Sequence, residues 1–419
     1  MTAAAARPGA WRWRHLLDGP HRLGFFLAMV VLGAAAAWWA LVQLQRLGAL
    51  PATETALPPS LVHGAVMTFG FFPLFFAGFL FTAGPRWLGV RGPTAATLLP
   101  PLAAQAAGWL VWLAGSQVHA GVALAGLLLA ASGWLRTTLL FWRLIRASTA
   151  PDRVHPKLIG VGLAVGGACL GGFAAALLLG ADAVAHRLVA SGLWGGIALV
   201  FVTVAHRMIP FFGAPPGSLL DAGGGWRQLG LMAGVALFEA LAVWLQEPFA
   251  GAPPWQLARA LVELAAGGVL LWTAAAWSRA QNLRIRLPAM LHLGLVWFAL
   301  ALLLQAGAAL RAWHSGDAGL PLAALHAMAM GSLASLMVAM VTRVSASHAG
   351  EPVAAQDLVW VLFWLLQAAA VLRIAATLPR LPGQSLLAAA ALLFAAVVLI
   401  WGVRYGSGYG RPAAAPRHR

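Results

Sequence analysis

Apolar stretches of about 20 residues recur along the whole chain, and they limit what it can fold into more than any other feature. In hydrocarbon every backbone N–H and C=O group needs an internal partner, so a spanning segment forms a helix or joins a closed barrel. Barrel strands are half as long and alternate apolar with polar residues, whereas these stretches are uniformly apolar. The sequence therefore predicts an all-α polytopic membrane protein.

Composition and charge agree with this prediction. Hydrophobic residues make up 61% of the chain and charged residues only 9%, while soluble domains are about one quarter charged. The net charge of +16 does not indicate nucleic-acid binding, because the 27 basic residues are spread among short loops. A single cysteine, Cys169, excludes a disulfide framework within the chain. We expect the lipid bilayer as a partner and no nucleic acid.

Turn-forming and charged breaks divide the chain into about twelve transmembrane helices. The expected spans are 23–45, 61–84, 95–115, 119–142, 158–180, 184–206, 227–246, 256–278, 287–310, 319–342, 355–378 and 383–403. Residues 1–22 are expected to be a cytoplasmic lead-in that is retained rather than cleaved. Residues 23–405 would form a single membrane domain, and residues 406–419 a basic cytoplasmic tail.

The distribution of basic residues tests this count. With both termini in the cytoplasm, every inner loop is richer in arginine and lysine than its outer neighbours, as the positive-inside rule requires. The outer side and the span interiors keep only Arg46, Arg136, Arg187, Arg259, Arg311, Arg373 and Arg380. With one span more or fewer, arginine-rich loops would fall on the outer side. The pattern therefore favours twelve spans with cytoplasmic N- and C-termini.

Polar side chains within spans are costly and mark candidate sites. Only Glu239 and Glu263 are acidic residues clearly inside spans. This weakens the hypothesis of a proton-driven transporter, because such proteins usually need carboxylates in their core. No P-loop, dinucleotide fingerprint or HExxH motif is present. Histidine remains, with twelve copies. Those at loop edges are interpreted as hydrogen-bonded interfacial residues: His119, His155, His186, His314 and His348.

Two histidines share a pattern that these others lack. His63-x-x-x-Met67 and His326-x-x-x-Met330 each begin a span that runs from outside to inside. Residues four apart lie on one helix face, so each helix offers an imidazole and a thioether together. Imidazole suits heme iron or copper, and thioether sulfur selects copper(I). The alternative is that both methionines only fill gaps in the core.

A second candidate set is expected near the cytoplasmic side. It comprises His206 and Arg207 in AHRMIPFF, His292 in LHLGLVW, and Arg343 in MVTRVSAS. The two histidines would form a second ligand pair. The two arginines would hold heme propionates through charge-assisted hydrogen bonds, unless they are only positive-inside anchors.

At these segments the chain resembles the NnrS family. The resemblance covers essentially the whole chain and is sharpest at residues 63–87, 207–212, 291–297 and 326–350. It implies a twelve-span, multi-pass protein of the bacterial inner membrane that contains heme b and copper. It also implies nitric oxide as a ligand and a role in denitrification or nitrosative stress, without an established turnover reaction. In the first block the family's second histidine and its glutamate are replaced by Ala65 and Val66.

The leading hypothesis is a heme-binding protein, with copper as a further metal, that protects against nitric oxide. One alternative is a transporter of a small solute, copper or heme that uses the same His and Met groups, although no six-plus-six repeat is visible. A quinol-linked heme redox enzyme ranks last, because no cluster of closely spaced histidines is present.

Overall fold

A computed structural model describes residues 10–213, 225–249, 251–280, 282–316, 321–349 and 354–412. Within these ranges the chain is helical and contains no strand, and twelve of its helical segments are long and apolar enough to span a membrane. The predicted all-α membrane bundle is thus confirmed. Parts of the predicted lead-in and tail, residues 1–9 and 413–419, lie outside the described residues.

The spans fall into three consecutive groups of four. A 3₁₀ turn, η1 (Trp13–Asp18), precedes the first group, which is α1 (Pro20–Arg46), α2 (Pro59–Ala65) with η2 (Val66–Gly70) and α3 (Phe72–Leu88), α4 (Ala95–Val118) and α5 (Ala120–Ala147). The second is α6 (Val154–Leu178), α7 (Asp182–Ser191) with η3 (Gly192–Ala198) and α8 (Leu199–Gly213), α9 (Gly225–Leu245) and α10 (Pro253–Ala280). The third is α11 (Arg286–Ser315), α12 (Pro321–His326) with η4 (Ala327–Leu333) and α13 (Ala334–Ala349), α14 (Asp357–Ala375) and α15 (Gly383–Tyr409).

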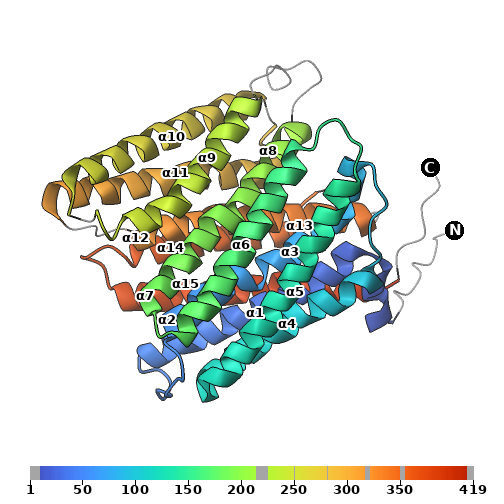
Figure 1. The fold of residues 1–419 in the computed structure, drawn as a ribbon, viewed down its shortest axis with the longest axis horizontal. Helices are drawn as coiled ribbons and strands as arrows, with labels where there is room; N and C mark the ends of the chain where they lie inside the picture. Colours follow the sequence, from blue (N-terminus) through green and yellow to red (C-terminus); the bar gives the residue numbers. More distant parts are fainter. Residues whose placement is uncertain are drawn as a thin grey trace.

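Both described chain ends lie at the same end of the bundle, as an even number of spans requires (Figure 1, right). The backbone N–H of Arg12 donates to the carbonyl of Gly410 at 2.7 Å, and the guanidinium of Arg22 donates to the carbonyls of Tyr409 and Arg411. We call this the terminal end. The starts of α2, α7 and α12 lie at the opposite end (Figure 1, left).

The second span of each group is central. In the apolar windows of these three spans 89%, 83% and 78% of the residues are buried, against 39–56% in the other nine. The first span of each group packs on the second through small residues. A Cβ on Gly24 would lie 2.6 Å from Cα of Gly78, and one on Gly196 would lie 2.8 Å from Cα of Gly166. Such close approach is how membrane helices gain packing energy without a hydrophobic driving force between them.

Each central span is also interrupted by a π-helical segment: η2, η3 and η4. A π segment widens the helix locally and leaves part of its hydrogen-bond ladder open, and such segments are frequent at functional sites. Each of the three begins in the half of its span that is nearer the end opposite the termini. The regular pattern of three groups therefore directs attention to the region where the π segments meet.

Candidate functional site

A cavity of about 530 Å³ opens among the central spans at the end opposite the termini. This volume is within the usual range for small-molecule and cofactor sites. Its polar, sulfur-containing and aromatic lining residues are Trp39, Arg46, Ser60, His63, Met67, Thr68, His186, His326, Met330, Arg373 and Phe394. They come from α1, from all three central spans, and from α14 and α15. This is the region of the π segments.

The structure brings the two predicted His-Met pairs to this one cavity. His63, Met67, His326 and Met330 all line it, although the two pairs come from spans 2 and 10. His326 ends α12, immediately before η4 begins, and Met330 lies within η4. Met67 lies within η2. In each span the π segment therefore follows the histidine and carries the methionine.

The orientation of His326 suits a ligand at its free ring nitrogen. Its Nδ1 lies 2.7 Å from the carbonyl oxygen of Leu322. A carbonyl only accepts, so Nδ1 carries the proton and donates, which leaves the Nε2 lone pair available. Metal-bound histidines are commonly fixed in this way, with one ring nitrogen donating to a backbone carbonyl.

His186, in α7 of the remaining central span, is held in the same way. Its Nδ1 lies 3.0 Å from the carbonyl oxygen of Asp182, again four residues earlier, and its side chain lines the cavity. The sequence interpretation of His186 as an isolated interfacial residue was therefore incomplete. The signal that points to it is its place near the start of a span that runs parallel to spans 2 and 10.

His63 is held by ring stacking. Its ring lies 3.9 Å from that of Trp39 with an interplanar angle of 18°. Nδ1 of His63 is buried and has no hydrogen-bond partner among the described residues, and the side chain lines the cavity. The guanidinium of Arg46 lies 5.3 Å from the centre of the Trp39 ring, a cation–π contact. Trp39 thus contacts both Arg46 and His63 at the cavity wall.

The charge of the cavity is one-sided. Arg46 and Arg373 line it, and no aspartate or glutamate does so among the residues that the structure describes. The charge of Arg373 acts electrostatically on both His63 and His326. Sequence reasoning treated the two arginines only as residues left on the outer side. Their position against the positive-inside trend was the available signal.

The second predicted set does not assemble in the same way. Nδ1 of His206 lies 3.0 Å from Nε2 of His155, and no hydrogen bond or ring contact joins His206 to His292 in the described ranges. Arg207 lies 5.0 Å from the centre of the Trp87 ring. Arg343, half-buried near the end of α13, does not line the cavity. The contact between His206 and His155 was not predicted, and His206 and His292 as a ligand pair stay a prediction.

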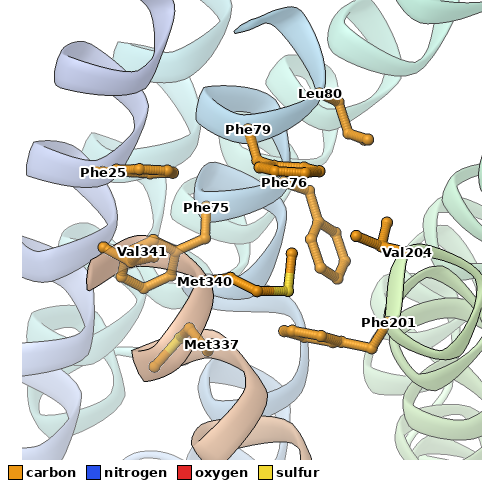
Figure 2. A pocket seen from close by; sticks show the side chains of 10 residues that line it. All are labelled: Phe25, Phe75, Phe76, Phe79, Leu80, Phe201, Val204, Met337, Met340 and Val341. Atoms are coloured by element: carbon orange, nitrogen blue, oxygen red, sulfur yellow. The ribbon is translucent and has the colours of Figure 1, made fainter. Parts of the chain in front are cut away.

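Closer to the terminal end the same three spans enclose a small apolar void. It measures about 20 Å³ and lies where α1, α3, α8 and α13 meet. Figure 2 shows its ten lining side chains, among them Phe75, Phe76, Phe201, Met337 and Met340. All ten are apolar, so no ionisable group of the cavity continues into this layer.

Comparison with known proteins decides the family. A family model described as "NnrS protein" matches residues 15–412, nearly the whole chain. The chain belongs to the NnrS family. No curated protein matched the sequence.

The resemblance implies a second histidine and a glutamate where this chain has Ala65 and Val66, and neither of these two residues lines the cavity. Ala65 and Val66, which replace the polar pair, are fully buried and do not line it. His63 and Met67 on either side of them do.

Proposed function

We propose that this NnrS-family protein binds heme b in the cavity and that His63 and His326 hold the iron. Membership of the family makes it a multi-pass membrane protein related to nitric-oxide stress. The observation that carries the proposal is the convergence of the two histidines, from spans distant in sequence, on one cavity of cofactor size. Cofactors in helix bundles are commonly held between facing helices in this way.

The residues present fit a heme. Nε2 of His326 has its lone pair free, Trp39 and Phe394 supply flat apolar surface, and the arginines can face carboxylates. Bound heme iron would supply a metal that nitric oxide can coordinate in place of one of the two histidines. The apolar layer of Figure 2 excludes water from the side of the terminal end. A protein of the bacterial inner membrane with such a site would bind the gas before it reaches other metal centres.

Copper is the second candidate metal for His63, Met67, His326 and Met330, because thioether and imidazole ligands select copper(I). The charges of the cavity favour heme over a bare cation, since two arginines and no acid line it. Transport of a small solute, copper or heme through the same cavity is the alternative function. It is favoured by the exposed position of His186 and Leu322, which places the cavity mouth at the surface.

The test is a pyridine hemochromogen assay with metal analysis on the detergent-purified protein. Stoichiometric heme is expected in the parent, and His63→Ala or His326→Ala should remove it or alter its spectrum. His314→Ala is the matched control, because His314 is exposed and does not line the cavity. Protein that stays colourless after expression with ample heme contradicts the proposal. Uptake into proteoliposomes without bound cofactor supports the transporter instead.

A further inference from the structure

Two arginines of the cavity have no acidic partner. Arg373 lies half-buried in the last turn of α14, and it has no hydrogen-bond or ion-pair partner in the part of the chain that the structure describes. Arg46 contacts only the Trp39 ring there, by its cation–π interaction. A guanidinium within a span is costly unless an anion or a hydrogen-bond acceptor compensates it. The chain itself does not supply that anion.

The position of Arg46 is fixed relative to the ligand-facing histidine. The Trp39 ring contacts the guanidinium of Arg46 and is stacked on the ring of His63. Arg373 faces the same cavity from α14 and acts electrostatically on His63 and His326. Two cations from α1 and α14 are therefore presented to the space that the histidines border.

We infer that Arg46 and Arg373 form an anion-binding end of the cavity, which takes the carboxylate or oxyanion group of its ligand. Guanidinium binds such groups through two parallel N–H donors. This inference rests on the proposed function where the anion is a heme propionate. The same chemistry would also bind a free oxyanion such as nitrite.

The anion-binding end explains Arg373 better than membrane anchoring does, whereas Arg46 is exposed at the last residue of α1. Arginines that serve as anchors lie at the cytoplasmic ends of spans and reach towards water or lipid headgroups. Arg373 lies instead at the opposite end, half-buried, with its side chain at the cavity wall. Arg380 is exposed at the same end and does not line the cavity, so it provides the contrasting case.

The experiment compares heme with heme dimethyl ester, in which both carboxylates are capped. Apoprotein would be titrated with each in detergent, using the parent, Arg373→Gln, Arg46→Gln and the control Arg380→Gln. Each cavity variant should weaken heme binding by roughly ten- to hundredfold, because a charge-assisted hydrogen bond is lost. Binding of the dimethyl ester should stay unchanged in every variant, and Arg380→Gln should match the parent with both ligands.

Equal weakening for heme and its ester in the cavity variants would overturn the inference while leaving heme binding intact. If the parent binds neither porphyrin, the proposed function fails, and calorimetry with nitrite then decides the inference. Nitrite binding that needs Arg373 supports the anion-binding end with a free oxyanion, whereas nitrite binding that is absent or unaffected by Arg373→Gln overturns it. Arg373→Lys, which keeps the charge, covers the case in which Arg373→Gln does not fold.

Discussion

Two arginines inside the bundle differ in what surrounds them. Arg259 on α10 donates from Nη2 to Glu239 at 3.1 Å and from Nε to Glu263 at 2.6 Å, and Nη1 donates to Gln246. Arg373 on α14 faces the cavity, with no acid among the described residues that line it. Glu239 and Glu263 compensate the charge of Arg259, whereas the charge of Arg373 faces the cavity and any ligand in it. Burial alone does not separate a structural charge from a ligand-binding one; the partner does.

The largest expected effect follows from removing the paired arginine. Arg259→Met leaves two fully buried carboxylates without their cation, and breaking a buried ion pair in this way costs about 3–5 kcal/mol. The free energy of unfolding in mixed micelles, followed by tryptophan fluorescence, would measure it. Arg373→Met is the matched variant and should stay within about 1 kcal/mol of the parent, since no pair is broken. Equal losses in the two variants would remove the distinction between them.

The second prediction asks whether the cavity or the terminal end holds the cofactor. His326→Ala should lower the heme content strongly, whereas His206→Ala should leave it nearly unchanged. The reason is that His326 lines the cavity and His206 is paired with His155 instead. Heme content per protein, from the hemochromogen assay, is the measurement. Loss of heme in His206→Ala but not in His326→Ala would move the site to the terminal end.

The twelve-span fold and part of the candidate site could be predicted from the sequence. The twelve spans followed from hydropathy and loop charge, because both act through the bilayer and need no tertiary contact. The shared face of His63 and Met67, and of His326 and Met330, followed from the i, i+4 geometry. Their meeting in one cavity was suggested by their matching depth in two parallel spans.

The remaining features depend on tertiary packing. The π segments η2, η3 and η4 come from a shift in backbone hydrogen bonding that has no sequence signature of its own. Arg373 and Arg46 come together only because α14 and α1 both border the cavity. The contact between His206 and His155 depends on how their helices are rotated against each other, and hydrophobic periodicity does not fix that rotation.

The third prediction separates the two metals. Met67→Leu and Met330→Leu exchange a thioether for a hydrocarbon of similar volume, which usually costs less than about 1.5 kcal/mol. If copper binds with the help of the sulfur atoms, copper content should fall while heme content stays at the parent level. Met337→Leu is the control, because Met337 lines the apolar void and not the cavity. Elemental analysis of purified protein would decide, and equal copper in all three variants would assign the two cavity methionines to packing.

The smallest expected effect concerns the apolar layer of the central spans. Val204 borders the void of about 20 Å³, whereas Val202 on the same helix is equally buried but does not border it. Val204→Leu places its extra methylene in free space, so the free energy of unfolding should change by less than about 0.5 kcal/mol. Val202→Leu must force the same group into close packing, which costs about 1–3 kcal/mol. Unfolding of both variants under one set of conditions measures the difference. If Val204→Leu is as destabilising as Val202→Leu, the layer is closely packed around Val204 as well, and the void has no room for a methylene.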